Sequence, residues 1–146
     1  MARRTKLIKS TGEEQWSNRL HHVPNSELAE DTAQSSGMRR REAISGAKTG
    51  SEKIWMGESH LEPATRSANH HHGDSETGIY ILRGNPVFVL LEGDEEIRIE
   101  TRPGDYLFVP PHVAHREENP SVTEEAVVIL ARSTQEAIVV NLSNEA

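Results

Sequence analysis

Apolar side chains beyond residue 76 gather in short runs that are separated by turn-forming residues. Gly-Asn-Pro, Gly-Asp, Pro-Gly-Asp, Pro-Pro and Asn-Pro-Ser stand between the runs. Short strands with turn signals at this spacing predict an all-β sandwich or barrel, and no stretch beyond residue 50 has the apolar period of a helix. The expected strands cover residues 79–82, 87–91, 97–99, 106–109, 126–130 and 137–142.

Two of these runs differ in how apolar and polar residues alternate. In Glu-Glu-Ile-Arg-Ile-Glu-Thr, alternation predicts that Ile97 and Ile99 face the interior while Arg98 and Glu100 face solvent. Residues 87–91, by contrast, are apolar on both faces. We therefore expect that strand to be covered on both sides, by the core and by either the N-terminal arm or another subunit.

The chain divides into residues 1–50, an irregular N-terminal arm, and residues 51–146, one β-barrel domain. The arm is polar and has little apolar periodicity, so we expect it to be flexible or draped on the barrel or on a partner subunit. Within the arm, Trp16 is expected to be a docking contact with the barrel or the partner subunit. His21 and His22 are expected to be solvated loop residues, and His60, close to the histidine run, to have a packing or supporting role.

Charge and composition limit the classes of partner that the chain is expected to bind. Residues 1–50 hold nine Lys and Arg against six Asp and Glu, whereas residues 51–146 hold seven against seventeen. An acidic body argues against nucleic acid, which binds through phosphate neutralisation; Arg39, Arg40 and Arg41 are expected to be solvated or paired with acidic neighbours. With no cysteine, no membrane-length apolar run and no secretory pattern, we expect a cytoplasmic protein without membrane contact.

The run Asn-His-His-His-Gly supplies the clearest candidate chemistry. In a strand, His70 and His72 point to one face and His71 to the other. A turn at Gly73 could bring the Glu76 carboxylate to the same centre, and His115 would add a third imidazole from a distant strand. Three imidazoles and one carboxylate suit a divalent transition metal, Mn, Fe, Co, Ni or Zn, rather than Ca or Mg. The alternative is an exposed polar loop that takes up metal adventitiously.

These residues resemble the two signature motifs of the cupin superfamily. The first is His-x-His, three or four residues, then Glu, six residues and Gly, matched here by His70, His72 and Glu76. The second is Gly, five residues, Pro-x-Gly, two residues, His, three residues and Asn. Its spacings are met by Gly104, Pro110, His115 and Asn119. The resemblance implies a single-domain jelly-roll barrel, a double-stranded β-helix, with His70, His72, Glu76 and His115 as metal ligands.

Two departures from the motifs leave alternatives open. Seven residues separate Glu76 from Gly84 where the family has six, which indicates either a β-bulge or a ligand role for His71. His112 stands where the second motif has its glycine. It is either a turn residue with positive φ, which His tolerates better than most side chains, or a proton donor or acceptor at the barrel mouth.

Members of the superfamily include dioxygenases, isomerases, decarboxylases and hydrolases, so the resemblance implies a metalloenzyme acting on a small organic molecule. The alternative is a non-catalytic binding or sensing module with a structural metal. Tyr80 and His112 are the catalytic candidates. Exposed strand edges favour a homodimer, with Trp16 and strand 87–91 as contacts. Tyr80, Leu82, Phe88, Leu90 and Phe108 are expected to face the barrel interior, either as the wall of a pocket or as packed core.

Overall fold

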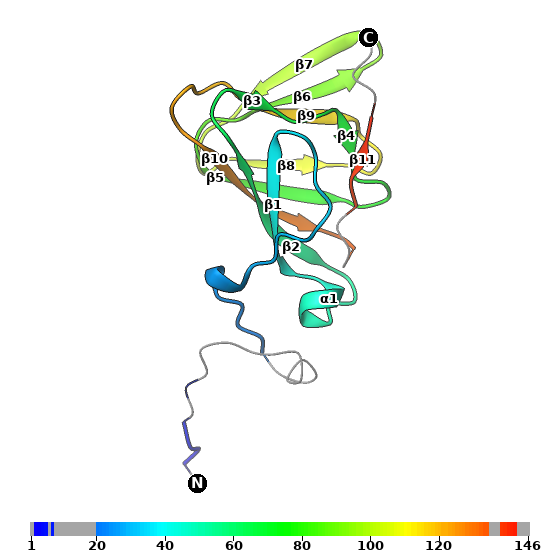
Figure 1. Cartoon of the computed structure of the whole chain (residues 1–146). Coiled ribbons are helices and arrows are strands. Elements are labelled where there is room, and N and C mark those ends of the chain that lie inside the picture. Colours follow the sequence, from blue (N-terminus) through cyan, green and yellow to red (C-terminus); the bar gives the residue numbers. More distant parts are fainter. Residues whose placement is uncertain (1, 6, 8–19, 135–137, 143–146) are drawn as a thin grey trace.

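The computed structural model describes residues 2–5, 7, 20–134 and 138–142, and it consists of two antiparallel β-sheets (Figure 1). One sheet has the order β1-β2-β10-β5-β8 and the other β11-β4-β9-β6-β7, with β3 paired to β9. The all-β jelly-roll prediction is confirmed. The strands are β1 Met38–Ile44, β2 Trp55–Leu61, β3 Thr65–Arg66, β4 His70–His71, β5 Thr77–Arg83, β6 Val87–Glu92, β7 Glu95–Glu100, β8 Tyr106–Val109, β9 His115–Asn119, β10 Ala126–Arg132 and β11 Val140–Asn141.

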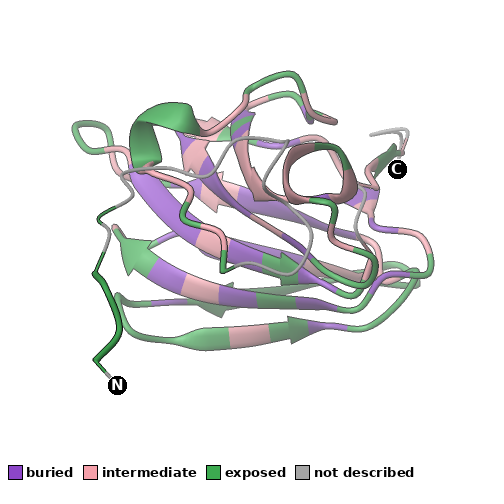
Figure 2. Cartoon of the chain, turned by 90° about the horizontal axis from the view of Figure 1, so that it is seen from below, coloured by how far each residue is buried: buried purple, intermediate pink, exposed green. Residues whose placement is uncertain are grey.

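Alternation along the strands fills the space between the sheets, as the alternating bands of burial in Figure 2 show. Ile79 and Ile81 of β5 pack inward with Val128 and Leu130 of β10, and Phe88 of β6 meets them from the other sheet. This cluster also contains Trp55 and Val109. Its β-branched and aromatic side chains suit a pleated surface that is covered on one face.

The barrel begins earlier along the chain than the sequence suggests. β1 lies within residues 1–50, the range assigned to the arm, and pairs with β2 from Met38 to Ile44. A short helix, α1 (Gly46–Thr49), follows it; the Ser45 side chain accepts a hydrogen bond from the Lys48 N–H, and Gly50 ends the helix at φ 72°. A 3₁₀ turn, η2 (Asn25–Glu27), precedes β1.

Strand 87–91 and strand 97–99 behave differently from each other. Val87, Phe88 and Val89 are buried within this single chain, in agreement with the expected cover on both faces. The prediction that Ile97 and Ile99 face the interior is wrong, because both are exposed. β7 is the edge strand of its sheet, and all six of its residues are exposed. The alternation of apolar and polar residues in β7 therefore does not separate a buried face from a solvent face.

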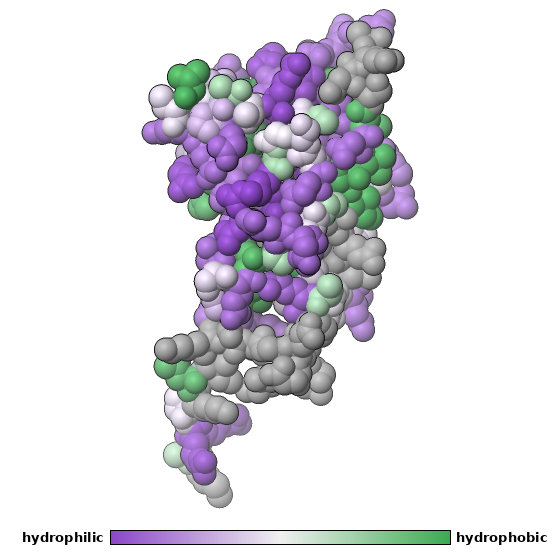
Figure 3. Space-filling model, viewed as in Figure 1, coloured by the Kyte–Doolittle hydropathy of each residue, from purple (hydrophilic) through white to green (hydrophobic). Residues whose placement is uncertain are grey.

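The outer surface over β1 is hydrophilic (Figure 3). Arg39 forms an ion pair with Glu30, and Arg41 pairs with Glu58 at 2.7 Å. The expectation that acidic neighbours pair with the arginine run therefore holds for these two, whereas Arg40 points into the barrel and is fully buried. Among the described residues, no helix is long and apolar enough to cross a membrane.

Candidate metal centre

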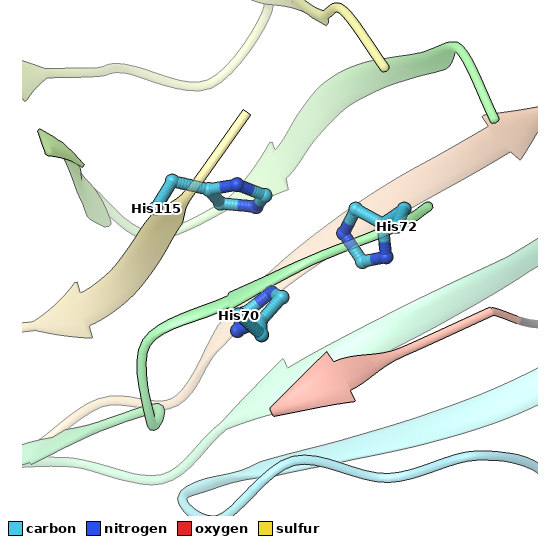
Figure 4. A group of neighbouring side chains, drawn as sticks. All are labelled: His70, His72 and His115. Carbon is cyan, nitrogen blue, oxygen red and sulfur yellow. The ribbon is translucent and has the colours of Figure 1, made fainter. Parts of the chain in front are cut away.

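Three buried histidines meet between the sheets. His70 lies in β4, His72 follows that strand, and His115 opens β9, directly opposite His70 in the strand pairing. One nitrogen of each ring lies within 4.8 Å of the others. Figure 4 shows the three rings around a common space. The structure thus brings together the three imidazoles that the sequence selected.

Backbone carbonyls set the protonation of all three rings. The Nδ1 atoms of His70, His72 and His115 lie 2.8, 2.8 and 2.9 Å from the carbonyl oxygens of Ala68, Ile138 and Val113. A carbonyl oxygen only accepts, so each Nδ1 carries a hydrogen and donates it. In the neutral form of each ring the Nε2 lone pair is therefore free, which is the form of histidine that ligates a metal.

The Nε2 atoms have the properties expected of metal ligands. Among the described residues, the buried Nε2 atoms of His70 and His115 have no hydrogen-bond partner. Burial lowers the pKa of His70 to about 4 and that of His72 to about 2, so both rings are neutral at ordinary pH. Buried acceptors without a donor are costly, and a cation at the common point would satisfy them.

Glu117 supplies a buried carboxylate that the sequence reasoning missed. It is 1% exposed, and its oxygens lie 3.4 Å from His70 Nε2 and 3.7 Å from His115 Nε2. These oxygen–nitrogen distances are those expected between two ligand atoms that each bind the same metal at about 2.1 Å. The available signal was alternation: Glu117 is two residues after His115 in β9, so both face inward.

The ionisable side chains of the centre shift one another's pKa values. Burial acts to raise the pKa of Glu117, but the neighbouring imidazoles of His70 and His115 and the charge of Arg40 outweigh it and lower that pKa. Burial likewise acts to lower the pKa of His115, yet the adjacent Glu117 carboxylate raises it overall. Glu117 is therefore an anion in the interior, and it attracts positive charge to the three rings.

The Glu76 side chain, by contrast, is exposed and does not join the three histidines. Its N–H donates to Ser133 Oγ and its carbonyl accepts from the Ser133 N–H, each at 3.0 Å. The neighbouring Thr77 is the residue that faces inward, together with Ile79 and Ile81. The extra residue between Glu76 and Gly84 is a β-bulge farther along β5, because Ile81 and Arg83 pair with the successive residues Val128 and Val127 and leave Leu82 unpaired.

The structure shows what three residues of the second motif do for the local backbone. Gly104 has φ 96°, as a turn glycine does, and His112 has φ 61° in the place of the family's glycine, which agrees with its interpretation as a turn residue. The Asn119 amide donates to the carbonyl oxygens of Leu61 and Glu124 at 3.1 and 2.8 Å. Asn119 thus anchors the end of β9, the strand that carries His115.

His71 and His112 lie next to each other outside the buried centre. Their ring centroids are 5.6 Å apart, and His112 Nε2 is 2.6 Å from an Asp74 carboxylate oxygen. The N–H of Gly73 donates to His71 Nδ1 at 3.0 Å. His71 is therefore turned away from His70 and His72, as strand alternation predicts.

Of the five residues expected to face the interior, the structure supports two. Phe88 is buried in the core, and Leu90, opposite His115 in the strand pairing, is half-buried. The prediction that Tyr80, Leu82 and Phe108 line the interior is wrong. Tyr80 packs on Tyr106 on the outer face with ring centroids 5.0 Å apart, and the other two are exposed.

Parts of the expected arm and one neighbouring histidine can also be placed. His60 does not reach the centre; its ring nitrogens lie 2.9 Å from Glu125 and 2.8 Å from Glu58, on the outer side of β2. His21 is half-buried and His22 exposed. Trp16 lies outside the described residues, so its predicted contact stays a prediction.

Comparison with known proteins gives one family. The family model described as "Cupin domain" matches residues 57–131. The chain is 29% identical over 84 residues to a 3-hydroxyanthranilate 3,4-dioxygenase of Burkholderia lata, covering 55% of this chain and 48% of that protein. A homologous dioxygenase of Paraburkholderia phytofirmans gives the same values. The chain thus spans about half the length of the curated relatives it matches.

Solved structures give the same fold at low identity. The polyketide cyclase RemF of Streptomyces resistomycificus superposes with a TM-score of 0.67 at 17% identity, covering 87% of this chain and 88% of that one. An S161A mutant of Bacillus subtilis oxalate decarboxylase gives a TM-score of 0.66 at 21% identity, covering 77% and 30%. At these identities, the likeness concerns the fold.

Proposed function

The chain belongs to the cupin family, and we propose that it is a metal-dependent enzyme acting on a small organic molecule. The observation that carries the proposal is the set of three imidazoles with their Nδ1 atoms bonded to carbonyls and their Nε2 atoms directed to one point. Two of the buried Nε2 atoms have no hydrogen-bond partner among the described residues, and the nearby Glu117 carboxylate can only accept, so a cation at the common point would satisfy all of these groups.

We propose that His70, His72, His115 and Glu117 hold one divalent transition metal. Nitrogen and carboxylate ligands suit Mn, Fe, Co, Ni or Zn. The proposed set keeps the three histidines that the motifs imply but takes its carboxylate from β9 instead of Glu76. The distances from Glu117 to His70 and His115 support this exchange.

A bound metal would supply Lewis acidity toward a carbonyl or a coordinated water. The residues of the chain would have separate tasks around it. The backbone carbonyls of Ala68, Val113 and Ile138 hold the imidazole hydrogens in place. Phe88 and Leu90 exclude water on the side of β6, and His112 lies outside the buried rings, where it can exchange protons with solvent.

The first experiment measures metal per chain in protein purified without a histidine tag. We expect close to one transition metal per chain in the wild type, loss of that metal in His72→Ala and His115→Ala, and retention in His71→Ala. His71 is the matched control because it lies between two proposed ligands and points away from them. Folded wild-type protein that takes up no Mn, Fe, Co, Ni or Zn would contradict the proposal.

The reaction class rests on the relatives. The names of the matched dioxygenases support oxidation of a small aromatic acid as one option, and decarboxylation or isomerisation by a cupin metal centre are the others. Turnover of a panel of carboxylic acids and catechols by metal-loaded protein tests this, with His115→Ala as the inactive control. Absence of turnover across the panel, with metal bound, would favour the second candidate.

That second candidate is a non-catalytic cupin that binds or senses a small molecule. One observation favours it: among the described residues, the histidines and carboxylate buried at the centre are the proposed ligands themselves. If all four hold the metal, acid–base chemistry must come from the substrate, from water or from a residue at the mouth such as His112.

Other expectations remain predictions. A homodimer would be seen by light scattering. Its predicted contact through strand 87–91 has less support now, because Val87, Phe88 and Val89 are buried within one chain. Exposed apolar side chains lie instead on β5 and on the edge strand β8, namely Leu82, Tyr106 and Phe108. A cytoplasmic location and the lack of nucleic-acid binding stay predictions too.

A further inference from the structure

Three side chains share one rung on the inner face of the β1-β2-β10-β5-β8 sheet. Arg132 of β10 is paired with Trp55 of β2 on one side and with Thr77 of β5 on the other. Arg132 is 2% exposed, and Trp55 and Thr77 are 0% exposed. The rung therefore lies inside the barrel, and it offers a cation, an indole and a hydroxyl in adjacent positions.

The guanidinium of Arg132 is buried without a hydrogen-bond acceptor. Within the described part of the chain, its Nε, Nη1 and Nη2 atoms have no partner, and neither has Thr77 Oγ1. Arg132 Cζ lies 4.7 Å from the centroid of a Trp55 ring, and the Trp55 indole is itself held by a 2.9 Å bond to Glu42. The stacking offsets part of the burial cost, but five N–H donors remain unused.

The charges around this rung are unbalanced. Arg40 of β1 is also fully buried, and its guanidinium donates to Ser35 Oγ at 3.2 Å. Glu117 is the buried acid that acts on both arginines, but its oxygens lie beside His70 and His115. Two guanidinium groups thus face one carboxylate, and a divalent metal at the histidines would add further positive charge.

Arg132 remains a cation despite its burial. Burial, followed by the charge of Arg40, lowers the pKa of Arg132 to about 9, which is still above neutral pH. After burial, the charge of Arg132 has the largest effect in lowering the pKa of His72. The chain itself joins the rung to the centre: Thr77, opposite Arg132, is five residues after His72, and the turn between them is closed by a hydrogen bond from the Ser75 N–H to the His72 carbonyl at 3.1 Å.

We infer that Arg132 and Thr77 bind the carboxylate of a small organic acid whose remainder reaches the histidine centre. The planar guanidinium matches a carboxylate in two parallel hydrogen bonds, and the Thr77 hydroxyl can donate a third. The stacked Trp55 ring holds the guanidinium plane in position. A neutral sugar or alcohol would leave the cation unpaired and is disfavoured for that reason.

This inference deepens the proposed function, since it names the substrate class of the same site, but its test does not require turnover. The chain has two tryptophans, Trp16 and Trp55, so a Trp16→Phe background makes Trp55 the one indole reporter beside Arg132. Mn²⁺-loaded protein in this background is titrated with benzoate, and with benzamide as the uncharged analogue. We expect saturable change in Trp55 emission with benzoate and none with benzamide.

Substitution then assigns the effect to the rung. Arg132→Met keeps an unbranched apolar side chain but removes the guanidinium and its charge, and we expect at least a tenfold weaker affinity for benzoate with unchanged Mn²⁺ per chain. Arg102→Met removes an exposed arginine and should bind benzoate as the wild type does. If Arg132→Met does not fold, Thr77→Val, nearly equal in size to threonine, is used, and it should weaken benzoate binding severalfold.

The outcomes separate this inference from the metal proposal. Equal benzoate affinity in the wild type and Arg132→Met, or failure of Mn²⁺-loaded wild type to bind benzoate and acetate, overturns the role of Arg132 and leaves the metal proposal intact. Binding of inorganic phosphate in place of carboxylates also overturns it. Protein that takes up no metal yet binds benzoate through Arg132 supports the inference and contradicts the metal proposal.

Discussion

The barrel interior has two regions with opposite energetics. The apolar cluster around Ile79, Ile81, Val128 and Leu130 is buried and needs no partner beyond its own packing. The neighbouring polar region of three histidines, Glu117, Arg40 and Arg132 is equally buried, but it contains atoms without a hydrogen-bond partner among the described residues. Apolar burial stabilises the fold, whereas unpaired polar burial costs free energy. The difference places the proposed binding site in the polar region of one continuous core.

The largest expected effect comes from damaging the apolar region. Ile81→Ala removes a fully buried side chain and should lower the free energy of unfolding by about 2–5 kcal/mol, through lost transfer energy and a residual cavity. Chemical denaturation measures it. Metal bound per folded chain should stay at the wild-type value, and a variant that folds stably yet loses metal would show that the two regions are not separable.

An intermediate effect is expected at the carboxylate of the polar region. Glu117→Gln keeps the shape of the side chain but removes its charge, so metal affinity should fall at least tenfold, or by about 1.4 kcal/mol or more. Calorimetric titration with Mn²⁺ measures it. Glu76→Gln is the matched control and should bind as the wild type does, because Glu76 is exposed; the reverse result would restore Glu76 as the ligand.

The smallest effect is expected on the outer face, in the cluster of His60 with Glu58 and Glu125. Burial acts to raise the pKa of Glu58, but His60 and Arg41 outweigh it and lower that pKa; His60 also lowers the pKa of Glu125. A carboxylate with a lowered pKa stabilises the fold above its unfolded value, 4.5, and this contribution is lost as pH falls through the folded pKa.

The double variant Glu58→Gln, Glu125→Gln should therefore be less stable than the wild type near neutral pH, by less than about 1 kcal/mol. The difference in stability should begin to shrink near pH 4.5 and should vanish below the lowered pKa values of the folded protein. Thermal melts recorded between pH 7 and pH 3 provide the comparison. A difference that stays constant over this range would rule out the ion pairs as its cause. The metal content of the double variant should equal that of the wild type at each pH.

Sequence patterns predicted most of the fold because period-two alternation reports burial directly. They also selected His70, His72 and His115, since two lie on one strand face and the third is held by the spacing of the second motif. They did not place Glu76, whose side chain is exposed, and they put Tyr80 on the wrong face of β5, where Thr77, Ile79 and Ile81 are the buried residues. Residue type misled at Glu117 and Arg40, because charged side chains are rarely buried, and only the sheets reveal that both point inward.

The three carbonyls that receive the imidazole hydrogens belong to the main chain of Ala68, Val113 and Ile138. In a histidine oriented by an aspartate or a glutamine, one point mutation removes the acceptor. Here a change of side chain at these three positions leaves the acceptor in place, as long as the backbone keeps its path. The orientation of the rings is thus robust to mutation. The side chains around the centre can change, and with them the ligand specificity, while the three imidazoles keep the same orientation.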